Sequence, residues 1–373
     1  MTEYFGREMK KLGFGLMRLP KRENGSIDVE QTSKMVDMFM AAGMTYFDTA
    51  FVYQGSEDAI REALVKRYPR ESYTLATKLN AWLNSPDEET SKKQIYTSLE
   101  RTGAQYFDFY LLHAIQDNNY QVYAEQGIWE YAKELKEKGL VKHIGFSFHG
   151  SPALLETLLQ EHPEVEFVQL QINYADWENP AVTSHANYDI CRKYNKPIVV
   201  MEPVKGGTLA NPPQAVQDLL KAADPEMSIA SWAIRYVASL DGIMSVLSGM
   251  SNIAQMEDNL SYMKDFKPLS EDEQKLLLKV QETLNAIRQV PCTGCRYCVK
   301  GCPMGIQIPD IFTALNMHLI YGQTEQAKGR YNGTVTRSGA KASDCIHCMQ
   351  CEGACPQRIE VTKWLEEAAE VFE

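Results

Sequence analysis

Residues 292–303 read CTGCRYCVKGCP, and residues 345–356 read CIHCMQCEGACP. Both stretches follow the spacing C-x2-C-x2-C-x3-C-P, so eight of the nine cysteines fall into two copies of one pattern. Three closely spaced thiolates can hold three corners of a cube-shaped [4Fe–4S] cluster. The stretches therefore predict a small C-terminal domain organised around two metal clusters.

The same spacing is the ligand run of bacterial two-cluster ferredoxins, in which the fourth cysteine of each run ligates the other cluster. The first cluster is then expected to take three cysteines of the first run and the last of the second, namely Cys292, Cys295, Cys298 and Cys355. The second cluster is expected to take the complementary set, namely Cys302, Cys345, Cys348 and Cys351.

Two other uses of these cysteines compete with the cluster hypothesis. Structural zinc takes cysteines in separated pairs, whereas here a third cysteine and a Cys-Pro follow at short spacing. A disulfide framework requires an oxidising compartment, and the N-terminus shows no apolar leader segment. The ninth cysteine, Cys191, lies in an amphipathic stretch and is expected to be a buried, inert thiol.

Length and composition set the broad class of the protein. A chain of 373 residues exceeds the size at which a single core stops growing, so a large and a smaller domain are expected. The formal net charge of −11 argues against nucleic acid as a partner. No apolar run is long enough to span a membrane, and unprotected thiols favour a reducing cytoplasm.

Short β-rich runs alternate with amphipathic stretches over the first two thirds of the chain. We expect strands at 11–15, 45–48, 73–77, 107–112, 143–147, 167–171, 198–201 and 242–247. Helices are expected at 28–42, 56–67 and 126–138, with Gly43 and Gly139 at helix ends. This pattern predicts an α/β fold, a (β/α)8 TIM barrel. An open doubly wound sheet has the same local pattern, but no G-x-G-x-x-G follows the first strand.

The barrel pattern breaks at residues 265–269, where Lys267-Pro268 interrupts it. We expect a barrel domain at 1–268 and a mainly helical two-cluster domain at 269–373. A helix at about 271–288 should lead into the first cysteine run, with more helix between the runs.

Four polar residues lie at or just after the ends of expected strands, where barrel enzymes carry their catalytic groups. They are Asp48, Tyr53, Lys78 and His113. Each has an ordinary structural explanation when taken alone: a helix cap for Asp48, a surface charge for Lys78, a core histidine for His113.

As a set, these four residues resemble the aldo-keto reductases in type, order and spacing. The resemblance runs from about residue 12 to 260 and includes GFGLM at 13–17, FDTA at 47–50 and GFS at 145–147. It is closest to a subgroup with a ferredoxin-like extension, through EPVKGG at 202–207 and GFSFHG at 145–150.

The resemblance implies reduction of a carbonyl compound, or oxidation of the alcohol, with NADPH or NADH. A tyrosine hydroxyl becomes a better acid when a cation favours its phenolate. Tyr53 would then be the general acid and base, with Lys78 as the cation. Asp48 would keep the lysine charged, and His113 would orient the substrate oxygen.

The resemblance also implies a set of nicotinamide-binding residues along the mouth of the barrel. Ser147 and Gln171 would hold the carboxamide, and Gly15 and Met17 would line the mouth. The adenosine end would meet residues of the last helix, namely Gln255, Asp258 and Asn259. Arg18 and His149 are further candidates near the mouth, and Trp82, Trp177 and Phe51 are expected to line the substrate pocket.

Three positions depart from the family pattern. Met201 stands where an aromatic residue often stacks on the nicotinamide, and Phe148 stands where an asparagine commonly follows the serine. Gly249, Met250 and Gln255 stand where many members place Lys or Arg on the 2′-phosphate. The choice between NADH and NADPH is therefore open.

Hydride transfer moves two electrons, whereas a [4Fe–4S] cube passes one, and a flavin normally converts between them. Three hypotheses follow. The first is a nicotinamide-dependent carbonyl reductase whose clusters serve electron transfer, stability or docking. The second is a reductase fed by a ferredoxin-type partner, with flavin as an alternative cofactor. The third is a non-enzymatic redox-sensing or interaction module, against which the intact set of four polar residues argues.

Overall fold

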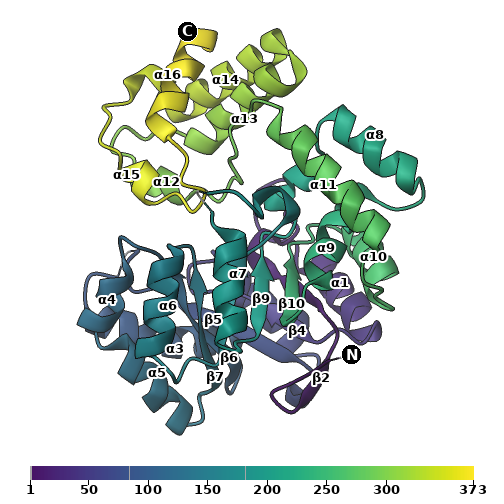
Figure 1. Cartoon of the computed structure of the whole chain (residues 1–373). Helices are drawn as coiled ribbons and strands as arrows, with labels where there is room; N and C mark the ends of the chain where they lie inside the picture. The colour runs from purple at the N-terminus through teal and green to yellow at the C-terminus, as the bar shows by residue number, and fades with distance from the viewer. Residues whose placement is uncertain (1, 84, 181) are drawn as a thin grey trace. The chain divides into compact units, whose positions relative to one another are not determined.

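The computed structural model describes residues 2–83, 85–180 and 182–373. The chain forms two compact units, shown in Figure 1. The barrel unit consists of Met1–Glu178, Thr183–Pro203 and Ser231–Leu269. The cysteine unit consists of Asn179–Val182, Val204–Ala230 and Ser270–Glu373.

Eight parallel strands close into a barrel in the order β10-β3-β4-β5-β6-β7-β8-β9. The strands are β3 (Leu12–Gly15), β4 (Tyr46–Asp48), β5 (Thr74–Leu79), β6 (Phe107–Ile115), β7 (Val141–Phe148), β8 (Phe167–Gln171), β9 (Ile198–Met201) and β10 (Ile243–Ser248). The predicted TIM barrel is confirmed, and each of the eight expected strands overlaps one of these. Because all eight run in the same direction, their carboxyl ends share one end of the barrel.

Helices follow the strands around the barrel. They are α1 (Val29–Ala41), α2 (Ser56–Ile60), α3 (Glu88–Thr102), α4 (Tyr120–Glu125), α5 (Ile128–Glu137), α6 (Pro152–Glu161), α7 (Ser184–Lys193), α9 (Ile229–Ser239) and α10 (Ile253–Met263). The side chain of Asp28 caps α1 by accepting from the Gln31 amide, and Gly43 and Gly139 have positive φ just beyond α1 and α5. The helix expected at 56–67 is α2 followed by a π-helical turn, η2 (Arg61–Val65). Further single turns are η1 (Leu16–Arg18), η3 (Arg70–Ser72) and η4 (Tyr174–Asp176).

A hairpin of β1 (Thr2–Tyr4) and β2 (Arg7–Met9) precedes the barrel. Phe5 in its turn stacks on His143 with ring centroids 4.2 Å apart and meets the edge of Phe109 at 5.8 Å. Met9 packs in the same apolar cluster as Tyr46, near the amino ends of the strands. The hairpin therefore covers that part of the core and leaves the carboxyl ends to carry polar groups.

The cysteine unit is helical apart from its cysteine loops. Its helices are α8 (Gln214–Ala223), α11 (Glu271–Asn285), α12 (Tyr297–Lys300), α13 (Ile308–Tyr321), α14 (Thr324–Ser338), α15 (Gln350–Gly353) and α16 (Val361–Phe372), with single turns η5 (Lys205–Ala210) and η6 (Ala342–Asp344). The predicted helix before the first cysteine run is α11, which starts with a capping box between Ser270 and Glu273. The helix predicted between the two runs is present as α13 and α14.

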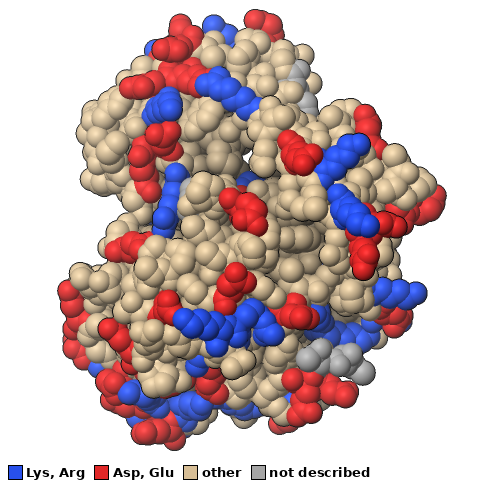
Figure 2. Space-filling model, in the orientation of Figure 1, with Lys and Arg blue, Asp and Glu red and all other residues tan. Residues whose placement is uncertain are grey.

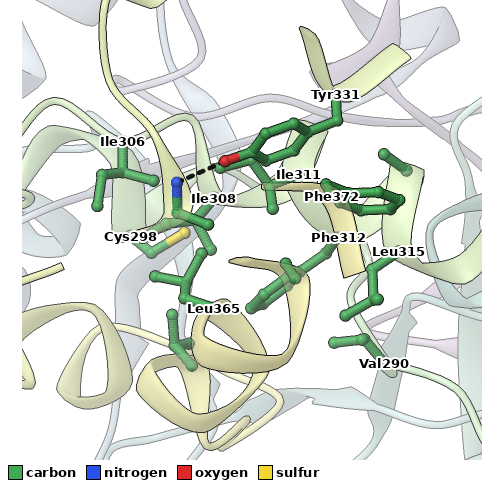
Figure 3. Packing of buried hydrophobic residues seen from close by; sticks show 14 of the residues in the cluster. Val290, Cys298, Ile306, Ile308, Ile311, Phe312, Leu315, Tyr331, Leu365 and Phe372 are labelled. Atoms are coloured by element: carbon green, nitrogen blue, oxygen red, sulfur yellow. Dashed lines mark hydrogen bonds between the residues drawn. The ribbon is translucent and has the colours of Figure 1, made fainter. Parts of the chain in front are cut away.

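An apolar core ties the two cysteine runs to α13, α14 and α16, as Figure 3 shows. Cys298 and Cys351, one from each run, are buried members of this core. Tyr331 of α14 is buried beside Phe372 of α16, and its hydroxyl accepts a hydrogen bond of 2.8 Å from the Ala342 amide. The loops that carry the cysteines are thus anchored on a packed helical frame.

Lys and Arg alternate with Asp and Glu on the face drawn in Figure 2, without an extended basic stretch. No helix of the described chain combines the length and apolarity needed to cross a membrane.

Within the cysteine unit, the segment that follows β9 touches the backbone of the first cysteine run. Gly206 has φ of +65°, and a Cβ placed on it would lie 2.4 Å from the carbonyl oxygen of Thr293. Only glycine permits both this conformation and this approach. Thr293 is itself buried, next to Cys292.

We expect Gly206→Ala to destabilise the cysteine unit, because the methyl group would strain the backbone and collide with Thr293. The strain alone costs about 1–2 kcal/mol, and the collision adds to it. Gly339→Ala is the matched control, since Gly339 has φ of +74° and a Cβ placed on it would meet nothing within 4 Å. Thermal unfolding of the two variants should give the lower Tm for Gly206→Ala, and equal values would contradict the close approach.

Candidate functional site

An ion pair between two buried side chains lies at the carboxyl ends of neighbouring strands. Asp48 is the last residue of β4, and Lys78 is the penultimate residue of β5. Lys78 Nζ donates to Asp48 Oδ1 at 2.6 Å and to the carbonyl oxygen of Thr49 at 2.7 Å. Both side chains are almost fully buried, with exposed fractions of 1% and 4%.

Tyr53 and His113 lie around this ion pair. Lys78 Nζ is 4.9 Å from the centroid of the Tyr53 ring. The rings of Tyr53 and His113 meet edge to face, with centroids 5.6 Å apart. The structure thus brings together all four residues that the sequence placed at strand ends.

His113 is oriented by its own backbone. The register between β6 and β7 shifts between Leu112 and Ile115, and Ala114 has a left-handed φ of 56°. Such a bulge re-aims the neighbouring side chains. The His113 carbonyl accepts from Trp82 Nε1 at 3.3 Å and from the Tyr123 hydroxyl at 2.5 Å.

Burial governs the protonation of these groups. Burial lowers the pKa of Lys78, an effect that the neighbouring Asp48 carboxylate opposes. Burial likewise raises the pKa of Asp48, against the influence of Lys78. Burial lowers the pKa of His113 well below its usual value, and the charge of Lys78 lowers it further. His113 is therefore a neutral imidazole that can donate one hydrogen bond.

Several buried polar atoms at this end of the barrel have no hydrogen-bond partner among the described residues. They include Asp48 Oδ2 and His113 Nδ1. Unpaired buried polar atoms are costly, and native structures pair them with protein, water or a ligand. These two atoms therefore suit a polar ligand, such as a carboxamide or a carbonyl oxygen, at the carboxyl ends of β4 and β6.

The residues expected at the nicotinamide end occupy the same rim. Gly15 is the last residue of β3, and a Cβ placed on it would lie 3.4 Å from the carbonyl oxygen of Ser248. Met17 lies in η1, and Met201 is the last residue of β9. Ser147 Oγ accepts from the Ala114 amide at 2.7 Å. Gln171 Nε2 donates to Asp176 Oδ2 at 3.3 Å.

The residues expected at the adenosine end lie on or just before α10. Gln255 Oε1 accepts from the Ser251 amide at 2.7 Å, and Asn259 Nδ2 donates to Asp258 Oδ2 at 3.4 Å. Residues 249–259 contain no Lys or Arg. A Cβ on Gly249 would nevertheless lie 3.7 Å from the side chain of Arg18, a neighbour that the sequence did not indicate.

Arg18 and His149 have partners that the sequence could not reveal. Both terminal guanidinium nitrogens of Arg18 lie 3.4 Å from Glu202 Oε1, so this cation already faces a carboxylate of the protein. Glu202 follows β9 with a left-handed φ of 57°. Burial lowers the pKa of His149 to about 4, with a hydrogen bond to Gln171 acting in the opposite direction.

Of the three aromatic residues expected to line the substrate pocket, Trp82 lies next to the four polar residues through its bond to the His113 carbonyl. Phe51 packs under the guanidinium of Arg101 at 4.7 Å. Trp177 stacks on His185 at 4.4 Å.

We call the two ligand sets expected from the sequence the two cysteine groups, and each of them takes thiols from both runs. Burial and then the nearby thiols of Cys295, Cys292, Cys355 and Cys351 raise the pKa of Cys298. A single pocket is lined by Cys302 of the first run and by three thiols of the second, Cys345, Cys348 and Cys351. The pocket thus contains the four thiols expected to hold the second cluster. Cys191 is a fully buried free thiol of α7, as predicted.

Among the described residues, no three His, Cys, Asp or Glu side chains converge on a site for one metal ion. Structural zinc needs four ligands at about 2.0–2.3 Å from one point. A [4Fe–4S] cube instead presents a separate iron to each thiolate, so its four ligands surround a larger object. The four thiols that line one pocket could surround such a cube.

Comparison with known proteins matches each of the two parts of the chain to a protein family model. Residues 11–282 match the model of the Aldo/keto reductase family, and residues 291–359 match that of the 4Fe-4S dicluster domain. A probable aldo-keto reductase 1 of Glycine max is 30% identical over 211 residues, which cover 54% of this chain and 58% of that protein. An uncharacterized oxidoreductase of Bacillus subtilis is 23% identical over 299 residues, or 72% of this chain and 92% of that protein.

Solved structures share the barrel. An aldo-keto reductase of Bacillus halodurans in its holo form superposes with a TM-score of 0.58 at 23% identity, covering 74% of this chain and 93% of that one. An aldo/keto reductase of Klebsiella pneumoniae in complex with NADP and acetate superposes with a TM-score of 0.60 at 19% identity. The match covers 73% of this chain and 92% of that one. At these identities the likeness shows the fold.

The mixed cysteine groups can be tested with double variants, because two losses in one group should remove one cluster. We expect Cys302→Ser/Cys345→Ser to keep about half of the roughly eight irons that two cubes hold. Cys302→Ser/Cys298→Ser should lose nearly all of them. Anaerobic iron analysis with EPR checks both, and Cys191→Ala is the control that should keep all the iron. The reverse order of the two double variants would show that each run holds its own cluster.

Proposed function

The chain belongs to the aldo/keto reductase family, and we propose that it transfers hydride between a nicotinamide cofactor and a small carbonyl or alcohol substrate. The observation that carries this proposal is the buried Lys78–Asp48 pair beside Tyr53 and His113. The protein is an oxidoreductase with a C-terminal 4Fe-4S domain, and the roles below are our assignment.

Bound nicotinamide supplies the hydride, so the protein must supply the proton and the orientation. We assign the proton to the Tyr53 hydroxyl, because the Lys78 ammonium near its ring stabilises the phenolate left behind. Asp48 keeps that ammonium charged inside the barrel. Neutral His113 donates a hydrogen bond that orients the substrate oxygen. In the oxidation direction, the Tyr53 phenolate takes the proton back.

The unpaired polar atoms support binding of the nicotinamide at the rim. We propose that Ser147 and Gln171 hold its carboxamide and that Gly15, Met17 and Met201 lie along the ring. Gly249 and the α10 residues Gln255, Asp258 and Asn259 would meet the adenosine end. The Klebsiella pneumoniae protein solved with NADP supports a nicotinamide cofactor, and Arg18, which pairs with Glu202, is a cation close to Gly249.

For the cysteine unit we propose two [4Fe–4S] clusters with the mixed ligand sets described above. The dicluster-domain match supports the two clusters, and the pocket lined by Cys302, Cys345, Cys348 and Cys351 supports the second ligand set. We propose a barrel domain at 1–268, a cluster domain at 269–373, and a reducing cytoplasm as the compartment that keeps these thiols available. A ferredoxin-type partner is the proposed source or acceptor of single electrons.

Replacing Tyr53 by Phe removes the proton donor but keeps the ring. We expect kcat/KM for reduction of an aromatic aldehyde with NADPH or NADH to fall by about 10²–10⁴-fold, the usual contribution of a general acid. The circular dichroism spectrum and Tm should be unchanged. Tyr96→Phe is the matched control, because Tyr96 is 52% exposed on α3. Activity within a few-fold of wild type would reject Tyr53 as the acid.

Nicotinamide alone should leave the clusters oxidised, because a two-electron hydride donor does not match a one-electron cube without a flavin. We expect anaerobic titration with NADH and then NADPH to leave the visible absorbance of the cubes unchanged, whereas dithionite bleaches it. Bleaching by either nucleotide, with a reduced-cube EPR signal, would show that the barrel and clusters exchange electrons directly. Cys298→Ser should then be assayed, because full carbonyl reductase activity in that variant would show that hydride transfer needs no relay.

A further inference from the structure

Exposed apolar side chains gather around one of the two cysteine groups. Five large hydrophobic side chains of the described residues are strongly exposed, and three of them line the pocket that holds Cys302, Cys345, Cys348 and Cys351. These three are Met304 at 41%, Ile346 at 59% and Met349 at 56%. We name them the apolar rim. Cys348 is itself exposed.

The internal repeat shows that this exposure is not a property of the motif. The residue after the first cysteine of a run is Ile346 in the second copy but the buried Thr293 in the first. The residue after the Cys-Pro is Met304 at the end of the first run but the buried Gln357 at the end of the second.

The third pair of equivalent positions differs in chemistry. Met349 in the second run corresponds to Arg296 in the first, and the backbone is left-handed at both, with φ of 58° and 65°. Arg296 forms an ion pair of 3.2 Å with Asp310. The same backbone thus carries a charged, ion-paired side chain at one cysteine group and an apolar side chain at the other.

Charge is also absent from the loops around the apolar rim. Residues 301–309 and 345–351 contain no Lys, Arg, Asp or Glu, in a chain that is 23% charged. Surfaces of monomeric proteins rarely leave such groups of apolar side chains together unless they bind something. A partner that fits here must present an uncharged surface of its own.

The size of the apolar rim restricts the kind of partner. Stable protein interfaces bury about 1,200–2,000 Å² and use roughly 20–30 residues a side, whereas weak electron-transfer encounters are smaller. Three exposed side chains around one pocket match the smaller class. A stable dimer of this chain would need a much larger apolar area than the rim offers.

We propose that the apolar rim is the docking surface for a small iron–sulfur electron-carrier protein. The proposal rests on the proposed clusters and deepens the proposed function, because it names the kind of partner and the cluster that meets it. One electron passes from the reduced cluster of the carrier, which is oxidised, to the cube held by Cys302, Cys345, Cys348 and Cys351, which is reduced. No bond forms or breaks in this step, and no proton moves.

The test uses the anaerobically purified, iron-loaded protein and a reduced bacterial two-cluster ferredoxin as the probe. In Met349→Glu, we expect the second-order rate of cluster reduction in stopped flow to fall at least about tenfold, because docking would bury the new carboxylate. Met349→Leu should restore the rate. Leu278→Glu is the matched control, since Leu278 is 60% exposed on α11 and outside the rim. Dithionite, which needs no docking surface, should reduce all of these proteins equally fast.

Wild-type rates in Met349→Glu would overturn the proposal. If that variant loses iron, Met304→Glu replaces it, because Met304 lies outside both cysteine runs. An unchanged rate in Met304→Glu overturns the proposal as well. A wild-type dimer in sedimentation velocity that Met349→Glu dissociates would assign the rim to a second copy instead. Failure of the proposed function shows itself differently, as missing iron in the wild type or as an active Tyr53→Phe.

Discussion

The buried ion pair between Lys78 and Asp48 is the interaction on which the catalytic end of the barrel depends. Both side chains are buried, and Lys78 Nζ lies 2.6 Å from Asp48 Oδ1. Removing either partner would leave an uncompensated buried charge and lower the free energy of unfolding by about 3–5 kcal/mol. The pair is sustained because closure of the barrel fixes β4 beside β5, with Asp48 opposite Ala76, two residues before Lys78. Strand register therefore determines that the two charges meet and that the ammonium lies close to the Tyr53 ring.

Much of this end of the barrel could be predicted from sequence because its determinants are local. A polar residue that closes a short apolar strand must lie at the carboxyl end of that strand, and this rule places Asp48, Lys78 and His113 together once the barrel is assumed. Supports that come from distant segments could not be predicted in this way. The Trp82 and Tyr123 bonds to the His113 carbonyl, and the pairing of Arg18 with Glu202, join residues that no spacing rule relates.

The cysteine unit shows the same division between local and long-range information. The spacing of the cysteines predicts two clusters and, through the crossing rule of two-cluster ferredoxins, the ligand sets proposed for them. The environment of each group depends on packing from elsewhere. Thr293 meets Gly206, which belongs to the segment that enters the cysteine unit after β9. A sequence repeat cannot indicate that only one of its copies has such a neighbour.

The contrast between the two cysteine groups bears on how one chain combines hydride and one-electron chemistry. Two identical, equally covered clusters would give an external donor no preferred point of entry. Here the group that takes Cys355 from the second run lies against the buried Thr293, whereas the group that takes Cys302 opens at the apolar rim. On the proposed ligand sets, each run contributes to both clusters, and cysteines of both runs pack in one apolar core. The proposed cluster at the apolar rim is then the one that an external donor would reach first.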